Sequence, residues 1–258
     1  MQAPVICFGQ QPCGFFPKRF LVAKIRTARR LQQQLGGRLV FFYHDSDADY
    51  RETITLLRDR QTDAEVRLNF IQENKLQKKF SPLYLKRIPQ GWQEETRKQL
   101  PRFMDQPLID LFDSVAATNV ADFCLEMYEK LGLLEGIATV RSGDPAFRQA
   151  AADLGEGYFA DVPYQNEIVR AQLLDGRLKL HEGGGKYLTL PDQPLAKQQK
   201  NPGRETRFYW MQSVIGCTHY IYGEGEKAYL RTADFPGVEF VDREKIEQAD
   251  YAWLDQKL

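Results

Sequence analysis

The chain lacks an excess of charge of either sign and has no long apolar run. Among its 258 residues, 35 Lys and Arg balance 35 Asp and Glu. Proteins that bind nucleic acid or lie on anionic membranes generally carry excess basic charge, so we expect neither partner. The most apolar runs, residues 5–8 and 39–43, are far too short to span a bilayer. Since no basic n-region opens the sequence, we expect no signal peptide and a cytoplasmic protein.

Cysteine and histidine are scarce, and neither is spaced as a set of metal ligands. The four cysteines are Cys7, Cys13, Cys124 and Cys217. They include no C-x-x-C pair, which predicts reduced and mostly buried thiols, although Cys13 falls in a candidate site loop. The three histidines are His44, His181 and His219. They show no H-E-x-x-H or comparable spacing, so we expect no metal site.

The composition is that of an ordinary folded protein, and the first fifty residues have the pattern of a βαβ unit. Apolar residues make up 43% of the chain and charged residues 27%. An apolar run at 5–8 ends at Gly9, residues 18–35 carry apolar side chains at helical spacing, and a second apolar run occupies 39–43. This order predicts two buried parallel strands joined by a right-handed helical crossover.

The remaining chain predicts further strands and helices around this unit. We expect a hairpin of strands at 53–57 and 65–71, two or three helices within 92–132, a strand at 137–140 and a helix starting at Asp144-Pro145. Strands at 214–221 and 238–241, a helix at 226–232 and a C-terminal helix follow. Residues 1–258 are therefore predicted to form a single Rossmann-like α/β domain. Its open, mostly parallel sheet has helices on both faces and a small β-hairpin insertion.

One region, residues 164–206, is rich in glycine, proline and polar residues. It predicts a less regular part of the domain. Within it we expect a hairpin around Asp175-Gly176 and a long mobile loop at 191–205.

In such sheets ligands bind on loops at the carboxyl ends of the strands, and the first such loop is residues 9–19. Its sequence is neither G-x-G-x-x-G nor a P-loop. Gly9 and Gly14 would let the backbone approach a ligand, Gln10 and Gln11 offer amide groups, and Lys18 could neutralise a carboxylate or phosphate. An equally good interpretation is that the glycines and prolines only shape a tight connection.

The second loop carries three carboxylates in five residues, Asp45 to Asp49, directly after a predicted strand. They could bind an amine, a sugar hydroxyl or Mg²⁺, or provide a general base. The alternative is an Asp-rich turn that caps the next element. We favour a functional role for Asp47 or Asp49 and, from the pattern alone, a polar strand end for His44.

The third loop, residues 222–229, has the pattern G-x-G-E between a predicted strand and a predicted helix. Gly223 and Gly225 would place backbone N–H groups at the start of that helix, with Glu226 in its first turn. Glycine pairs are frequent at such turns, so this loop alone defines no ligand.

Four segments match known motifs in order. Residues 9–16 contain G-Q-Q-x-x-G-F-F, residues 46–50 read S-D-A-D-Y, residues 177–185 form a glycine-bearing hairpin, and Arg207 precedes Y-G-E-G-E-K-A-Y, which ends at Tyr229. The corresponding motifs are G-Q-Q-x-G-L-F, E-D-H-D-F, a similar hairpin, and R-P followed by Y-V-G-G-P-G-E-x-A-Y. Together the segments resemble the bacillithiol-biosynthesis cysteine-adding enzymes over most of the chain, with the thinnest match across 70–135.

The chain also departs from that family. Ser46 and Ala48 stand where the family has Glu and His, so a role of that histidine is kept only if His44, two residues before Ser46, substitutes for it. Tyr222 and Glu224 stand where it has Gly and Pro. Family members are about twice this length and end in a helical coiled-coil segment that this chain lacks.

The resemblance implies a core akin to the HIGH-type nucleotidyltransferases and formation of an amide between a cysteine carboxyl group and the amine of a sugar conjugate. Activation of the carboxylate by ATP or another nucleotide would be required. The substrate would be small and polar or zwitterionic.

The resemblance also implies roles for residues. Gln10, Gln11 and the helix N-terminus would hold the activating or acidic group, and Asp47 and Asp49 would orient or deprotonate the amine. Arg207 with Lys18 would neutralise negative charge. The facing wall would consist of Gly223, Gly225 and Glu226.

Two alternatives to a ligase or transferase remain at this stage. The changes at Ser46 and Ala48 favour a non-catalytic ligand-binding or accessory protein on the same core. A nucleotidyltransferase is less favoured, because the sequence has no H-x-G-H motif. All of these hypotheses require Gly9, Asp49 and Gly225 to lie at one pocket.

Overall fold

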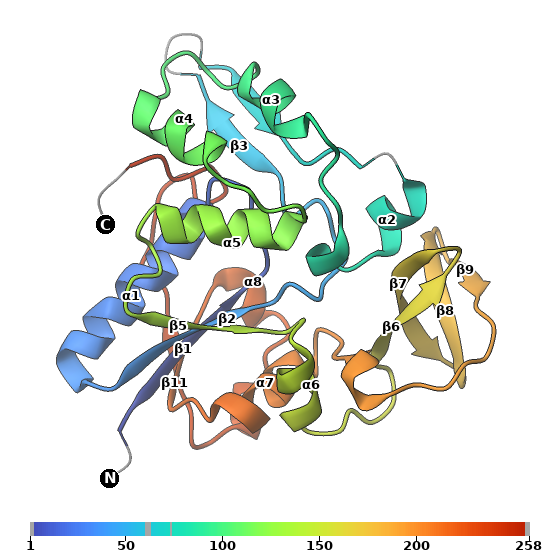
Figure 1. The fold of residues 1–258 in the computed structure, drawn as a ribbon. Helices are drawn as coiled ribbons and strands as arrows, with labels where there is room; N and C mark the ends of the chain where they lie inside the picture. Colours follow the sequence, from blue (N-terminus) through green and yellow to red (C-terminus); the bar gives the residue numbers. More distant parts are fainter. Residues whose placement is uncertain (1–2, 60–62, 73, 256–258) are drawn as a thin grey trace.

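A five-stranded, wholly parallel sheet lies at the centre of the computed structural model, which describes residues 3–59, 63–72 and 74–255 (Figure 1). In spatial order its strands are β12 (Glu239–Asp242), β11 (His219–Tyr222), β1 (Val5–Gln10), β2 (Arg38–Tyr43) and β5 (Ile137–Arg141). Every neighbouring pair is parallel. The predicted βαβ unit and the predicted strands at 137–140 and 238–241 are thereby confirmed.

Helices cover both faces of this sheet. One face packs on α1 (Arg19–Leu35) and α5 (Val120–Lys130), and the other on α6 (Pro145–Ala150) and α7 (Arg207–Ile215). The central strand is apolar on both sides because successive side chains point to opposite faces. Ile6 and Phe8 belong to the first core, whereas Val5 and Cys7 belong to the second.

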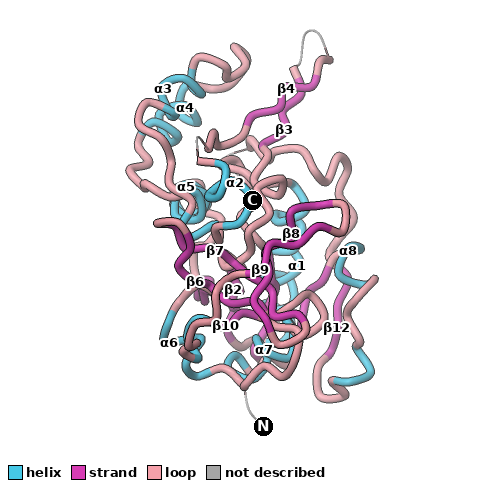
Figure 2. The backbone as a smooth tube through the Cα atoms, turned by 90° about the vertical axis from the view of Figure 1, so that its right-hand side faces the viewer, coloured by secondary structure: helices cyan, strands magenta, loops and turns pink. Residues whose placement is uncertain are grey.

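Smaller elements surround the first face. Strands β3 (Thr55–Arg58) and β4 (Glu65–Leu68) form the predicted antiparallel hairpin, which projects at the top of Figure 2. Its turn is expected around residues 61–63, of which 61 and 62 lie outside the described residues. The further helices are α2 (Lys75–Phe80), the 3-10 helix η1 (Leu83–Leu85), α3 (Trp92–Arg97) and α4 (Gln106–Asp113). With α5, the last two confirm the helices expected within 92–132.

A second sheet of five antiparallel strands lies beside the parallel one (Figure 1). Its order is β10 (Lys200–Asn201), β6 (Phe159–Tyr164), β7 (Glu167–Leu174), β8 (Arg177–Gly183) and β9 (Lys186–Thr189). The hairpin around Asp175-Gly176 is confirmed. Alternating apolar residues such as Val162, Val169 and Leu180 give this sheet a core of its own. The segment 164–206 is therefore far more regular than its composition indicates, and strand β10 with the 3-10 helix η2 (Lys197–Gln199) interrupts the loop expected at 191–205.

Three predictions in the last part of the chain are wrong. The strand expected at 214–221 begins only at His219, because α7 continues to Ile215 and ends at Gly216 in the left-handed conformation. The helix expected at 226–232 is the short α8 (Glu224–Lys227), followed by the 3-10 helix η3 (Thr232–Asp234). After β12, the described residues up to Asp255 contain no helix.

None of the helices in the described part of the chain combines the length and the apolarity that crossing a membrane requires.

Candidate functional site

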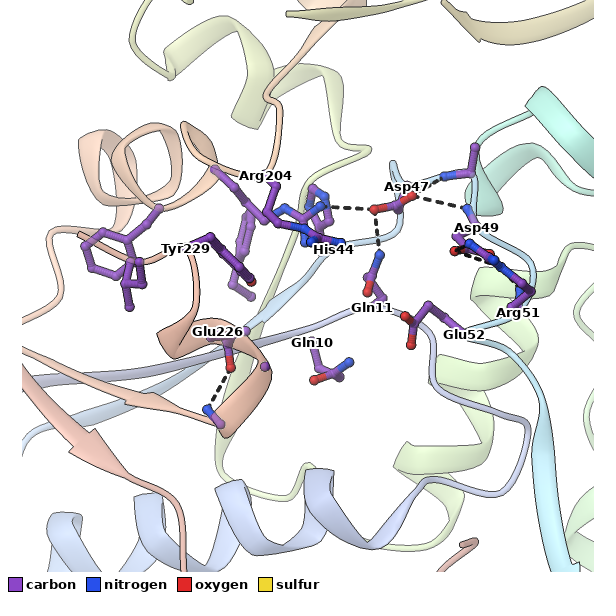
Figure 3. A pocket seen from close by; sticks show the side chains of 18 of the residues that line it. Gln10, Gln11, His44, Asp47, Asp49, Arg51, Glu52, Arg204, Glu226 and Tyr229 are labelled. Carbon is purple, nitrogen blue, oxygen red and sulfur yellow. Dashed lines mark hydrogen bonds and ion pairs between the residues drawn. The ribbon is translucent and has the colours of Figure 1, made fainter. Parts of the chain in front are cut away.

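One cavity of about 1160 Å³ opens at the carboxyl ends of β1, β2 and β11 (Figure 3). From β1 the chain proceeds to β2 and β5 on one side, whereas β11 and β12 lie on the other, so the order reverses between β1 and β11. Ligands of open α/β sheets bind at such a reversal. The position of the cavity is therefore the one that the strand order favours for a binding site.

All but two of the site residues predicted from the sequence line this cavity. The predicted site residues that line the cavity are Gly9, Gln10, Gln11, His44, Asp47, Asp49, Arg207, Gly223, Gly225, Glu226 and Tyr229. The expectation that Gly9, Asp49 and Gly225 share one pocket is confirmed. Parts of the glycine-bearing hairpin, Lys179, His181 and Gly183, face the same space from the antiparallel sheet.

Gly14 and Lys18 are not among the described residues that line the cavity. Gly14 has a φ of 101°, and its carbonyl accepts a hydrogen bond from the Tyr128 hydroxyl at 2.7 Å. Its role is to let the chain turn, since a side chain is strained at this φ. Lys18 is 8% exposed and pairs its backbone with Ala252. The direct ligand contacts expected of these two residues are therefore not supported.

The N-terminus of α1 does not face the cavity with free N–H groups. The amides of Arg19 and Phe20 donate to the carbonyls of Tyr251 and Ala249, at 2.9 and 3.0 Å. A helix N-terminus binds anions through unsatisfied amides, and these are already satisfied. The expectation that this helix end holds an acidic group is wrong, because the C-terminal segment occupies it.

Asp47 is held as an ionised carboxylate. It accepts hydrogen bonds from the Gln11 side chain at 2.5 Å, from Arg207 at 3.0 Å and from the Ala48 amide at 2.6 Å. Burial alone raises its pKa, but the charges of Arg170 and Arg207 outweigh burial and hold the pKa well below its usual range. Such a carboxylate orients and balances charge, and is a poor proton acceptor near neutral pH.

Asp49 is paired with the side chain of Arg51. The guanidinium donates to both carboxylate oxygens, with the shortest contact at 2.6 Å. Burial raises the pKa of Asp49, but these hydrogen bonds outweigh it and the net pKa is lowered. Of the two roles open to Asp49, orientation fits this arrangement better than deprotonation.

The ring of His44 is buried and has no hydrogen-bond partner among the described residues. The residue is 1% exposed, and neither Nδ1 nor Nε2 is bonded. Burial is the largest cause that lowers the pKa of His44 well below its usual value, and the positive charges of Arg207 and Arg170 add to this effect. The ring is therefore neutral, with one N–H donor and one acceptor nitrogen.

Glu52 also lines the cavity, although the sequence pattern did not single it out. Burial raises its pKa; the charge of Lys18 opposes the rise, and those of Asp49 and Asp47 support it. A carboxyl group with a raised pKa is a better proton acceptor than its ionised neighbours. The acidic run from Asp45 onward was a signal for this residue, which lies only three positions after Asp49.

Glu226 fixes the third loop to the first. One of its carboxylate oxygens accepts from Lys24 at 2.5 Å and from the Gly223 amide at 2.9 Å, and the other accepts from the Tyr220 hydroxyl at 2.8 Å. Lys24 also donates to the Gly9 carbonyl at 2.7 Å. Glu226 and Lys24 therefore connect the third loop to α1 and to the end of β1. Lys24 stands among mostly apolar residues on the buried face of α1, and this position is the sequence feature that indicates a role for it.

Three arginines of the cavity, Arg170, Arg204 and Arg243, form no ion pair with a carboxylate in the described part of the chain. Arg170, on β7, is 8% exposed and donates to the backbone carbonyls of Ser46 and Pro202. Arg204 lies over the Tyr229 ring, with 5.4 Å from its guanidinium carbon to the ring centroid. The sequence pattern indicates neither Arg170 nor Arg204, because both lie within residues 164–206, whose composition predicts a less regular region. They give the cavity positive charge that no described carboxylate neutralises at contact.

No group of three or more His, Cys, Asp or Glu side chains in residues 3–59, 63–72 and 74–255 is arranged to hold a metal ion. Comparison with protein-family models finds no match to this chain, and comparison with curated proteins finds none either. The geometry of the cavity is therefore the basis for a functional proposal.

Proposed function

We propose that the chain is a small-molecule ligase or transferase that forms an amide on a Rossmann-like core, as the resemblance to the cysteine-adding enzymes implies. Numbered in chain order, the parallel strands lie in the order 3-2-1-4-5, the arrangement of one doubly wound nucleotide-binding fold. This order supports the Rossmann-like, HIGH-nucleotidyltransferase-like part of the proposal.

The single observation that carries the proposal is the division of charge within one cavity. Asp47, Asp49 and Glu52 lie on the loop after β2, while Arg204 and Arg207 approach from the loop before α7 and its first residue. An amide-forming enzyme must hold an amine and a carboxyl group together, and the acidic and basic sides of the cavity suit these two groups. The expected substrate is accordingly small and polar or zwitterionic.

Each ionisation state suits a distinct role in this reaction. Asp47 and Asp49 are ionised and would orient the neutral amine by accepting hydrogen bonds from its N–H groups. Glu52 would accept the proton as the amine nitrogen attacks the acyl carbon and the leaving group departs with its electron pair. Arg207 would stabilise negative charge that develops on the acyl oxygen.

A nucleotide such as ATP belongs to this proposal as the source of a leaving group. Bound ATP would convert an unreactive carboxylate into an activated ester or anhydride. The cavity volume of about 1160 Å³ and the unpaired Arg204 fit a nucleotide phosphate beside a second substrate. The protein's own groups would bind and orient the amine and remove its proton.

A direct experiment tests the reaction. The protein is first screened by thermal shift against nucleotides, amino acids, amino sugars and small diacids, since a specific ligand raises the melting temperature. Pairs of ligands that bind are then incubated with ATP, and amide formation is followed by mass spectrometry. Ligand-dependent amide formation that Glu52→Gln abolishes while binding persists is the expected result. Binding of a ligand pair without any product would reject the ligase proposal.

A non-catalytic binding protein is the second candidate, and one observation favours it. Ser46, which stands where the resembling family has Glu, is fully buried, and its hydroxyl accepts from the Ser142 hydroxyl at 2.9 Å. Ala48 supplies no functional group in place of the family's His. If the thermal-shift screen finds a tight ligand and no product forms with any co-substrate, this candidate replaces the first.

A further inference from the structure

Two side chains of the cavity, the buried His44 and the half-buried Arg207, have nitrogen atoms without partners among the described residues. Both ring nitrogens of His44 and the Nε of Arg207 are inaccessible to solvent and make no hydrogen bond. Buried polar nitrogen atoms are rarely left unpaired, because each costs about 1–3 kcal/mol of desolvation. They belong to residues that line the cavity, so a group bound there that accepts hydrogen bonds would pair with the Arg207 Nε and with the N–H of His44 once these side chains shift.

A third donor group stands next to them. Arg204 is exposed, lies 5.4 Å from the Tyr229 ring centroid and pairs with no described carboxylate. Figure 3 shows Arg204 between Tyr229 and His44, with Asp47 beyond His44. The Tyr229 hydroxyl remains a neutral donor, because burial raises the pKa of this residue to about 12. Donors thus outnumber acceptors on this side of the cavity.

The acidic side chains nearby are already neutralised. The Asp47 carboxylate accepts hydrogen bonds from the Gln11 side chain and from a terminal nitrogen of Arg207. The Glu226 carboxylate accepts hydrogen bonds from Lys24 and from the Tyr220 hydroxyl. An incoming anion therefore meets the unpaired charge of Arg204 and the free donors of Arg207 and His44 rather than an unscreened carboxylate. An arginine pair that converges with neutral donors is the usual arrangement for binding carboxylate or phosphate oxygens.

We propose that Arg204, Arg207, His44 and Tyr229 form a subsite for one oxyanion group, a carboxylate or a phosphate, of the molecule that binds in this cavity. The inference rests on the proposed function only in taking the cavity as the substrate site. It groups Arg204, an unpaired charge of the cavity, with Arg207 and Tyr229 as one subsite, and it assigns His44 to binding rather than to proton transfer. The carboxylate and phosphate sources share this chemistry and are separated by experiment.

Inorganic phosphate and succinate are titrated separately into the full chain by isothermal calorimetry at constant ionic strength. We expect saturable binding of at least one of them, and the tighter of the two identifies the oxyanion class. Arg204→Gln should weaken that binding about tenfold, the loss expected for one charge-assisted contact. Because Arg204 is exposed, this variant should fold normally.

The matched control is Arg102→Gln. Arg102 is likewise exposed and has no described carboxylate partner, but it does not line the cavity. It removes the same net charge and should leave binding within about twofold of the original, as expected for a distant, screened charge. Equal weakening by both variants, or no binding of either oxyanion to the unaltered chain, would overturn the subsite.

The outcome is separable from that of the ligase proposal. Oxyanion binding that depends on Arg204 in a protein that forms no amide would keep the subsite and reject the enzyme. Amide formation that is insensitive to Arg204→Gln, without oxyanion binding, would reject the subsite alone.

Discussion

Within the acidic loop, neighbouring side chains decide which carboxylate can exchange a proton. Asp47, Asp49 and Glu52 lie within six residues of one another and are chemically similar. Arginine partners lower the pKa of Asp47 and of Asp49, whereas burial raises that of Glu52. Environments that separate the pKa values of similar groups distinguish a proton acceptor from an electrostatic anchor.

The first prediction at this scale concerns Glu52. If it is the general base, Glu52→Gln should lower kcat by about 10²-fold or more and change substrate binding little. In the unaltered protein, kcat should fall as the pH drops through the raised pKa of Glu52, since protonation removes the base. Steady-state kinetics over pH 4–9 measure both effects. A variant that keeps its full rate would assign the base elsewhere.

The second prediction concerns the pH dependence of stability at His44. Its pKa in the folded protein lies well below the ordinary 6.5, so below that pH the unfolded chain binds a proton that the folded protein excludes. This part of the stability is therefore present above pH 6.5 and is lost as the pH falls. The loss between pH 6.5 and 5.5 should be about 1 kcal/mol.

Urea unfolding across this range, compared with His44→Phe, isolates the contribution of His44. The phenylalanine variant should lose the pH-dependent step, while replacement of the exposed His181 by Asn should retain it. An identical pH profile in His44→Phe would show that other groups dominate this range.

At the scale of elements, the C-terminal segment closes the start of α1. The carbonyls of Ala249 and Tyr251 accept from the first amides of α1, and the amides of Ala252 and Trp253 donate to Leu56 and Pro17. The segment thus joins α1, β3 and the first loop by backbone hydrogen bonds. It replaces the capping side chain that α1 lacks.

Trp253 is the apolar anchor of this segment. It is 6% exposed, and the Arg26 guanidinium lies 4.6 Å from the centroid of its ring. Trp253→Ala should destabilise the protein by about 3–5 kcal/mol, as is typical of a buried aromatic residue. Urea unfolding measures the change. Tyr209→Ala, at a 53% exposed aromatic residue, should cost no more than about 0.5 kcal/mol. Equal effects of the two substitutions would contradict an anchoring role.

Elements with a local periodicity were predictable from the sequence, and those fixed by distant contacts were not. The βαβ unit and the hairpin at Asp175-Gly176 were predicted because apolar spacing and turn residues lie within them. The strand at 214–221 was misplaced because Val214 and Ile215 continue an apolar run that Gly216 divides into a helix end and a separate strand. The C-terminal sequence alone predicts a helix, because the partners that hold this segment, at 17–20 and 56, are remote in sequence.

The same distinction applies to the site. Gly9, Asp49 and Gly225 could be placed together because strands of a parallel sheet end at one edge, a general rule that needs no contact information. Arg170 comes from another sheet, and no pattern in its own strand indicates that it reaches Ser46. Likewise, the proton affinities of Asp47 and Glu52 depend on charges brought near by folding, which the sequence does not display.

At the scale of the whole molecule, a zero net charge conceals a strongly uneven cavity. The two sheets each bring part of it: the parallel sheet supplies the acidic loop, and the antiparallel sheet supplies Arg170 and Lys179. Arg170 lies where they meet, because it extends from β7 to the Ser46 carbonyl after β2 and to the Pro202 carbonyl after β10. The shape of the cavity therefore depends on the two sheets staying in the positions that these Arg170 contacts join.

The last prediction tests that coupling through Arg170→Lys. Lysine keeps the charge, but its single ammonium group cannot reproduce the planar fork that reaches two carbonyls. At least one buried carbonyl should lose its partner, at a cost of about 1–3 kcal/mol in the free energy of unfolding. Ligand binding should weaken as well, because the positive charge beside Asp47 would no longer be held in a fixed position.

The control is Arg177→Lys, on the exposed hairpin of the same sheet, which should change the free energy of unfolding by less than about 0.5 kcal/mol. Urea unfolding and calorimetry of both variants make the comparison, and unchanged stability and binding in Arg170→Lys would show that the two sheets are held together by other contacts.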